Sequence, residues 1–153
     1  MSRKRCIRKH YAKVDPIALA IAGATIASAE DLDKLRLREL SAIESFRAGT
    51  GTPSDFRDIA DMLNLAQTMG EMGIGPEVLP VCEAVEGALL EIKQFFDSHG
   101  RMAAWPLELR TMRDLYEFHD LQRTSVDRST YERAIQKTRN RIRSAHPDVK
   151  ELV

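Results

Sequence analysis

The sequence predicts an all-α protein: a compact bundle of about five main helices, preceded by a short N-terminal helix and a basic N-terminal arm. Two observations support this prediction. Apolar residues recur every three or four positions in five successive segments, which is the period of an amphipathic helix. No segment alternates with period two, and the chain contains only seven valines, so strands are not expected. Short connections between the segments favour antiparallel neighbours.

Cap and breaker residues delimit the first two main helices. Ser28 can cap a helix that runs to about Ala48, because Gly49 follows it. Thr52 and Pro53 are a start signal for the second helix. The two apolar stripes are Leu32, Leu35, Leu40, Ile43 and Phe46 in the first helix, and Phe56, Ile59, Ala60, Leu63, Ala66 and Met69 in the second.

The third helix, predicted over about residues 76–98, has the most regular pattern, and we therefore expect it at the centre of the bundle. Gly87 in its middle costs about 1 kcal/mol relative to Ala and indicates a close helix crossing. The fourth helix starts at Trp105-Pro106, and the last one ends before Pro147 after a break near residues 124–129. The three stripes are Cys82, Val85, Leu89, Ile92 and Phe96; Leu109, Met112, Leu115, Tyr116 and His119; and Tyr131, Ile135, Thr138, Ile142 and Ala145.

The length of 153 residues suits one domain. We divide the chain into a basic arm over residues 1–14, expected to be flexible, a single helical domain over 15–147 and a C-terminal tail over 148–153. Asp15 and Pro16 read as the cap and first residue of a short helix near 16–23. With 43% hydrophobic residues and no low-complexity tract, the composition excludes disordered and fibrous classes.

The N-terminal region also has features of a secretory signal: a basic stretch, an apolar run over 17–26 and the sequence Ala27-Ser28-Ala29. The run is mostly alanine with one leucine, so export is the less favoured interpretation. It is roughly half of the ~20 apolar residues that span a bilayer, so no membrane association is expected. Cys6 and Cys82 are too few for a disulfide framework and indicate a reducing compartment such as the cytoplasm.

Charge is balanced over the whole chain but separated along it. Residues 1–14 carry six basic and no acidic side chains, a net +6. Residues 15–120 hold 19 acidic and 9 basic side chains, a net −10, and residues 121–145 hold seven basic and two acidic ones, a net +5. Basic ends can bind phosphates. The alternative is that the ends fold back on the acidic middle or are simply solvated.

No catalytic constellation is recognisable, so we do not expect an enzyme, a cofactor or a metal site. Only His119 lies on an apolar face, and a packed histidine bonded to a neighbouring helix is favoured over a general base. Asp55, Asp58 and Asp61 step by three and read as a solvated stripe near a helix start rather than as metal ligands. Cys82, within an apolar seam, should be a buried, inert thiol.

The strongest functional candidate is the segment from Asp120 to Arg143, which reads as helix, tight turn, helix. Val126 could tuck under the turn, and the start of the second helix would then enter the major groove, as in a helix-turn-helix. An ordinary helical hairpin with a basic face is the alternative. The candidate nucleic-acid-binding residues, from both basic ends, are Arg3, Lys4, Arg5, Arg8, Lys9, Arg128, Ser129, Thr130, Arg133, Lys137 and Arg141.

The chain also resembles a group of uncharacterised small all-helical proteins encoded in phages and prophages of Gram-negative bacteria, sometimes labelled Fis-type transcriptional regulators. That label implies DNA binding. The resemblance covers nearly the whole chain and rests on the basic start ending in Asp15-Pro16, on Leu35-Arg36-Leu37-Arg38, Leu63-Asn64-Leu65-Ala66, Gly73-Ile74-Gly75 and Leu115-Tyr116-Glu117-Phe118-His119-Asp120, and on Glu132-Arg133-Ala134-Ile135 through Arg143.

Two functional hypotheses follow from the sequence. The first is a phage-encoded regulatory or accessory protein that uses its basic arm and basic last helix on nucleic acid. The second is a helical protein-interaction module that acts on a host or phage protein and has no nucleic-acid role. A homo-oligomer is a further option, because Leu37, Leu65, Leu90 and Phe95 lie off the main stripes. These residues could instead widen the buried faces of central helices.

Overall fold

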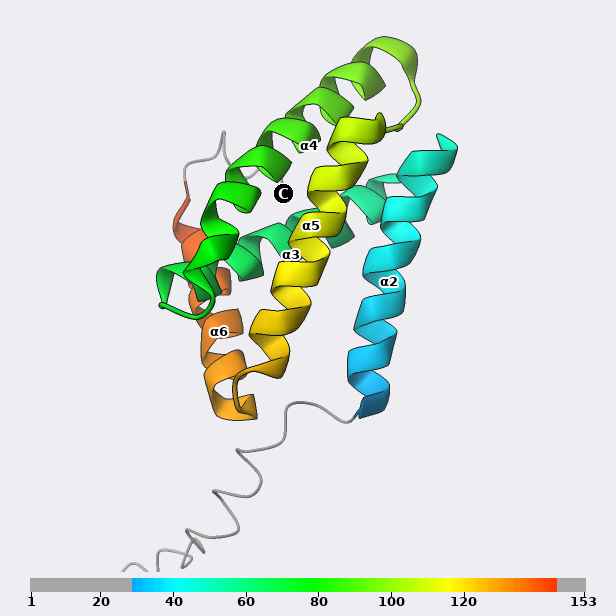
Figure 1. Ribbon diagram of the computed structural model, residues 1–153. Coiled ribbons are helices and arrows are strands. Elements are labelled where there is room, and N and C mark those ends of the chain that lie inside the picture. Colours follow the sequence, from blue (N-terminus) through cyan, green and yellow to red (C-terminus); the bar gives the residue numbers. More distant parts are fainter. Residues whose placement is uncertain (1–28, 146–153) are drawn as a thin grey trace, which may run out of the picture.

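A computed structural model describes residues 29–145 and confirms the all-α bundle (Figure 1). The elements are α2 (Ala29–Ala48), α3 (Pro53–Glu71), the 3-10 turn η1 (Pro76–Val78), α4 (Leu79–His99), α5 (Pro106–Thr124) and α6 (Arg128–Ser144). No strand occurs over 29–145, where the only β-type pairing is an isolated bridge between Gly51 and Met102. The basic arm, the short helix near 16–23 and the C-terminal tail lie outside the described residues.

Local sequence signals explain the helix boundaries. At the start of α3, the Thr52 hydroxyl accepts a hydrogen bond from the backbone N–H of Asp55, and the Asp55 carboxylate accepts one from the backbone N–H of Thr52. This reciprocal capping box satisfies two N–H groups that a helix end leaves free. The α4 helix ends at His99 and is capped by Gly100, whose φ of 67° is a left-handed conformation that glycine adopts without strain.

The start of the third predicted helix differs from expectation. Residues 76–78 form the separate turn η1, and α4 begins only at Leu79. The physical reason is Pro80, which has no N–H to donate to the carbonyl of Pro76, so the chain forms a 3-10 bond from Leu79 N–H to Pro76 O instead.

The centre of the bundle is α3, and the expectation that the helix over 76–98 would lie there is wrong. The α3 helix packs against α2, α4, α5, α6 and η1, whereas the main neighbours of α4 are α3, α5 and η1. In Figure 1, α3 crosses behind α5. Small buried residues of α3 let its neighbours approach, and these are Ala60, Ala66 and Gly70.

Gly87 does not mark a close helix crossing, which corrects a second expectation. A Cβ placed on Gly87 would have no heavy atom of another element within 4 Å. The close approach occurs instead at Gly51, where a Cβ would lie 2.5 Å from the buried ring of Phe46.

The core comprises the apolar stripes of α2 to α5. Phe46, Ile59, Ile92, Met112 and Leu115 are completely buried. Of the four apolar residues off the stripes, Leu37 and Leu90 are exposed, and Leu65 and Phe95 are half-buried. No helix over residues 29–145 is both long enough and apolar enough to cross a bilayer.

Candidate functional site

The segment that the sequence singled out forms two helices joined by a three-residue turn. The α5 helix ends at Thr124, α6 begins at Arg128, and Ser125, Val126 and Asp127 connect them. The Asp127 carboxylate caps α6 by accepting a hydrogen bond of 2.7 Å from the backbone N–H of Thr130. The predicted order of helix, tight turn and helix is therefore confirmed, and Val126 is half-buried at the turn.

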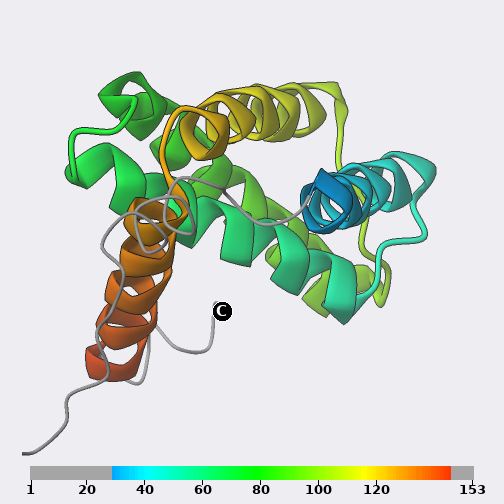
Figure 2. The same ribbon diagram turned by 90° about the horizontal axis from the view of Figure 1, so that it is seen from below.

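The α6 helix packs mainly on α3, not on the preceding helix α5. Its two buried residues are Ala134 and Thr138. Arg141 joins this contact, because it donates to the backbone carbonyl of Asn64 at 3.1 Å and forms an ion pair of 3.2 Å with Glu71. The rest of α6 projects from the bundle (Figure 2). The segment thus runs helix, turn, helix along the chain, and α3 supports its second helix.

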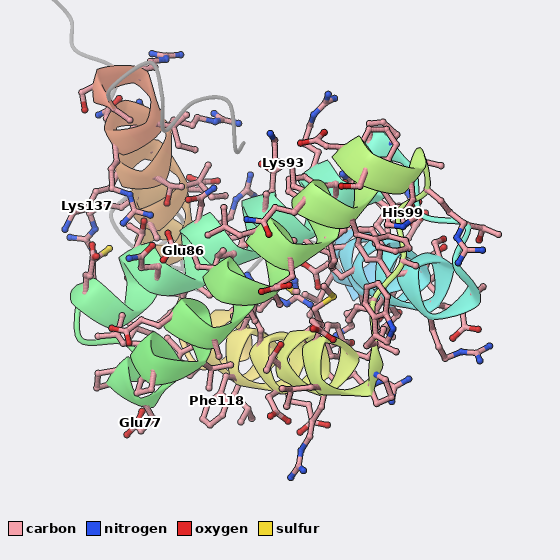
Figure 3. All side chains as sticks on the ribbon, turned by 90° about the horizontal axis from the view of Figure 1, so that it is seen from above. Glu77, Glu86, Lys93, His99, Phe118 and Lys137 are labelled. Carbon is pink, nitrogen blue, oxygen red and sulfur yellow. The ribbon has the colours of Figure 1, made fainter. Side chains whose placement is uncertain are left out.

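The structure places the predicted contact residues of α6 in three settings. Arg128 is exposed and forms an ion pair of 2.7 Å with Glu132, one turn further along the same helix. Arg141 is half-buried at α3. The others, Ser129, Thr130, Arg133 and Lys137, line the outer side or the start of α6, and all are exposed except the half-buried Thr130. Figure 3 shows Lys137 on the outer side of the helix. Arg3, Lys4, Arg5, Arg8 and Lys9 lie outside the described residues.

Two further exposed cations of α6, Arg139 and Arg143, were not among the predicted contact residues. With Arg133 and Lys137, they make a set of four α6 cations that have no ion-pair partner within residues 29–145. The signal that could have found them was their spacing, since residues four apart lie on the same side of a helix. We call these four residues the α6 cations.

The charge separation seen along the sequence is retained in space. The α6 helix carries six basic side chains and one acidic one, a net +5, while residues 29–127 hold ten basic and 19 acidic side chains, a net −9. Six of those ten cations pair with carboxylates: Lys34, Arg36, Arg38, Arg47, Lys93 and Arg123. The alternative, in which basic residues fold back on the acidic middle, is thus realised for Arg123 and Arg141 but not for the α6 cations.

Arg123 lies inside the bundle and is 1% exposed. Its guanidinium donates to both carboxylate oxygens of Glu39, at 2.9 and 2.8 Å, and to Asp120 at 2.9 Å. Asp120 also accepts two hydrogen bonds from Arg36, at 2.8 and 2.9 Å. Two arginines and two carboxylates thereby connect α2 to α5, and we call them the buried ion network.

The protonation states in this network follow from burial and pairing. Burial raises the pKa of Glu39, and the two N–H donors of Arg123 oppose that rise. The hydrogen bonds from Arg36 lower the pKa of Asp120. Although burial disfavours the Arg123 guanidinium, its hydrogen bonds to Glu39 raise its pKa. The sequence contained a usable signal for the network, because Glu39 falls within the apolar stripe of the first helix, four residues from both Leu35 and Ile43.

His119 is a packed histidine, as predicted, and 1% exposed. Its hydrogen-bond partner lies on its own helix instead of a neighbouring one: Nδ1 is 3.1 Å from the side-chain oxygen of Gln122. Gln122 in turn donates to the carbonyls of Ile74, at 2.7 Å, and Ala66, at 3.2 Å. Burial lowers the pKa of His119 to about 4, so the ring is neutral near pH 7.

A small pocket of about 120 Å³ lies beside His119, between α2, α3 and the junction of α5 with α6. Its polar wall includes Asp58 and Asp61, and the expectation of a solvated aspartate stripe holds for the exposed Asp61 but not for the half-buried Asp55 and Asp58. Asp58 pairs with Arg38 of α2, and Asp55 caps α3. Burial, and then the neighbouring Asp58, raise the pKa of Asp61. We call this the His119 pocket.

A second concave surface lies between α4 and α5 and has a volume of about 390 Å³. Its floor consists of the small residues Ala84, Gly87 and Ala88, with Leu107 of α5 beside them, and Leu107 is 72% exposed. Two carboxylates, Glu91 and Glu108, and Thr111 complete the lining. We call this the α4–α5 groove.

Two further kinds of site, a metal site and a reactive thiol, were sought among the described residues. Residues 29–145 contain no cluster of three side chains able to hold a metal ion. Cys82 is buried, as predicted, and burial raises the pKa of its thiol to about 11, so it is protonated and unreactive near neutral pH.

Comparisons of this chain with protein-family models, curated proteins and solved structures find no significant match.

Proposed function

We propose that the protein is a phage-encoded regulatory or accessory protein that binds nucleic acid through the α6 cations, with the basic N-terminal arm as a second contact. The observation that carries this proposal is which basic side chains of α6 form ion pairs with carboxylates and which do not. Four of the six basic side chains of α6 have no carboxylate partner over residues 29–145, in a protein whose remaining described part is strongly acidic.

The shape of α6 suits a polyanion. Its 17 residues correspond to a rod about 25 Å long, and a helix of this diameter fits the ~12 Å wide major groove of B-DNA. Only one side of α6 is used for packing, at Ala134 and Thr138. The carboxylate of Asp127 already binds the N–H group at the helix start, so phosphates would be held by side chains along the helix flanks.

The α6 cations lie on two flanks, and this distribution favours phosphate contacts over base contacts. Arg139 and Arg143 lie one turn apart on one side, and Arg133 and Lys137 lie one turn apart on the other. Cations on both flanks of a helix can reach both strands of a duplex groove. Such contacts fix position and give affinity without sequence preference.

The proposal is tested by fluorescence anisotropy with duplex DNA, single-stranded DNA and RNA over a salt series. The test variant replaces Arg133, Lys137, Arg139 and Arg143 by glutamine. The control makes the same change at the four cations of the body that lack an ion pair, Arg57, Arg101, Arg110 and Arg113. Both variants lose four positive charges, so net charge alone cannot separate them.

Each phosphate contact contributes about 0.9 to the slope of log affinity against log salt for B-DNA. We therefore expect the α6 variant to lower that slope by about 2–4, while the control variant changes it by less than 1. The proposal fails if the native chain does not bind at ~50 mM salt, where phosphate contacts are strong, or if both variants lose affinity equally.

The α4–α5 groove favours a second function, docking of a protein partner. The groove has an apolar floor and two carboxylates in its lining, and α4 carries four acidic side chains and one lysine. The complementary occupant is an amphipathic helix with a small apolar face flanked by lysine or arginine. Phe118, which is 36% exposed and points outward from α5 in Figure 3, extends the apolar surface toward η1.

Docking is tested by NMR titration with a synthetic helical peptide of leucine, alanine and lysine, and with the same peptide carrying glutamate for lysine. Amide shifts at Ala84, Gly87 and Thr111 with the lysine peptide alone, lost in Gly87→Leu, are the expected result. Equal shifts with both peptides, or shifts elsewhere, would contradict the assignment. Light scattering measures the molar mass of the native chain and so shows whether it self-associates, as docking of a second copy through its own basic α6 requires.

A further inference from the structure

We propose that the His119 pocket binds an alkylammonium group, either a small free amine or the end of a lysine side chain. This site is separate from the α6 cations and does not depend on nucleic-acid binding. The argument rests on the size of the pocket, on the hydrogen-bonding state of His119 and on the charges of the wall.

The pocket has the size and the apolar wall for a short hydrocarbon stem. An apolar cavity of about 150 Å³ holds a benzene molecule, so the 120 Å³ of this pocket suits a group of four to six non-hydrogen atoms. Leu35, Met62 and Leu65 supply its apolar side. A lysine side chain beyond its Cα has five such atoms, four of them carbon.

The hydrogen bonds of Gln122 determine which nitrogen of His119 carries the proton. The Gln122 amide nitrogen donates to the carbonyls of Ile74 and Ala66, so its oxygen is the atom that faces His119 Nδ1. An amide oxygen only accepts, and Nδ1 must therefore be the protonated nitrogen. Because the buried ring is neutral near pH 7, Nε2 holds a free lone pair.

That lone pair has no partner in the described part of the chain. Nε2 makes no hydrogen bond with any described residue. The only fully buried side-chain N or O atom without a partner in this part of the chain is Glu108 Oε2, so Nε2 is not sealed by protein. His119 lines the pocket, which is the open space adjoining the ring. A ligand here meets an acceptor that nothing else in residues 29–145 uses.

The charges of the wall select a cation. Three carboxylates line the pocket, those of Glu39, Asp58 and Asp61, against one cation, Arg38, a net −2. Glu39 is engaged by Arg123, and Asp58 by Arg38, whereas Asp61 has no ion pair or hydrogen bond within 29–145. The acceptors without a described partner are His119 Nε2 and the carboxylate of the exposed Asp61, and the Tyr131 hydroxyl lies beside them in the lining. They call for a ligand with several N–H donors and a positive charge.

An ammonium group fits this requirement better than a metal ion. No three metal-binding side chains converge anywhere in the part of the chain that the structure describes. An ammonium carries three donors, and the proposal assigns them to His119 Nε2 and the Asp61 carboxylate, with the stem against Leu35 and Met62. Tyr131 of α6 also lines the pocket, so the ligand would contact four helices at once.

The test is an NMR titration that follows the His119 ring resonances with n-butylammonium chloride at constant ionic strength. 1-Butanol, which has the same chain length and no charge, is the control ligand. We expect saturable shifts with n-butylammonium and none with butanol. Asp61→Asn should weaken binding roughly tenfold or more, the effect of losing one hydrogen bond to a charged group. Asp114→Asn, at an exposed aspartate of α5, should bind as the native chain does.

The two sources of the ammonium group are separated by a variant in which Lys4, Lys9 and Lys13 are replaced by glutamine. If a lysine of the chain occupies the pocket, n-butylammonium will bind more tightly to this variant than to the native chain. If the ligand is a free amine, the two will bind equally. The proposal is overturned if neither protein binds n-butylammonium, if butanol binds equally well, or if Asp61→Asn has no effect.

Discussion

Replacing Arg123 by methionine should lower the free energy of unfolding by about 3–5 kcal/mol, the range found when one partner of a buried ion pair is removed. The structure indicates a value in this range because Glu39, 7% exposed, would lose both of its N–H donors, at 2.9 and 2.8 Å. For a domain of this size, such a loss corresponds to a fall of about 10–20 °C in Tm.

A double-mutant cycle of Arg123→Met, Glu39→Met and the double variant separates the pairing from the packing. Replacing Arg123 and Glu39 together by methionine leaves no unpaired charge between them, and such apolar replacements are often neutral or stabilising. We expect the double variant to be more stable than Arg123→Met alone, although Asp120 then loses one of its two arginine partners. Arg128→Met, which breaks the exposed pair with Glu132, is the control and should change stability by less than about 0.5 kcal/mol.

Urea unfolding followed by circular dichroism at pH 7 measures the native chain, the three variants of the cycle and the Arg128→Met control. The deficit of Arg123→Met relative to the native chain should also shrink as the pH falls toward ~4.3, because a protonated Glu39 no longer requires a cation. A cost below about 1 kcal/mol for Arg123→Met, or a double variant no more stable than the single one, would refute the reasoning.

Three further predictions concern other buried groups. The pKa of His119 is lowered from 6.5 to about 4, so the unfolded chain takes up this proton at a higher pH than the folded chain does. The free energy of unfolding should therefore fall by about 3 kcal/mol as the pH falls from 6.5 to 4. This part of the pH dependence should be absent in His119→Gln. In a Cys6→Ser background, Cys82 should not react with a thiol reagent near neutral pH until the protein unfolds; prompt labelling of the native state would contradict its burial. Gly87→Ala should stabilise the protein by about 0.5–1 kcal/mol in thermal unfolding, because the new methyl group meets no atom of another element. Gly51→Ala should destabilise it by about 1–3 kcal/mol, because its Cβ would lie 2.5 Å from a buried ring. The reverse order of stabilities would show that the packing is misassigned.

The helices themselves could be predicted because their signals are local. The capping residues Thr52 and Asp55, the proline at 106 and the glycine at 100 act on backbone groups within one turn, and each lies where the structure begins or ends a helix. The one boundary that was misplaced, at residues 76–78, depended on Pro80, whose missing N–H is also a local property. The sequence shows this proline, but the regular apolar pattern that follows it favours a helix that already begins at residue 76.

The arrangement of the helices could not be predicted in the same way. The regular seam of α4 describes one buried face, whereas the centre is the helix with buried residues on several sides. In α3 these include Ala60, Thr68 and Met69, which lie on different sides of the helix. An apolar pattern in the sequence predicts that a face is buried, but it does not predict how many other helices pack around that helix.

The sequence by itself determined the main described helices, most of their limits and the uneven distribution of charge, since backbone capping and hydrophobic period act over a few residues. Only the tertiary structure decided which charges are matched. Arg123 and Arg133 are ten residues apart in the same basic stretch, yet one lies between Glu39 and Asp120 and the other faces outward from α6. Coulomb energy depends on distance through space and on burial, and these are established only when α2, α3, α5 and α6 pack together.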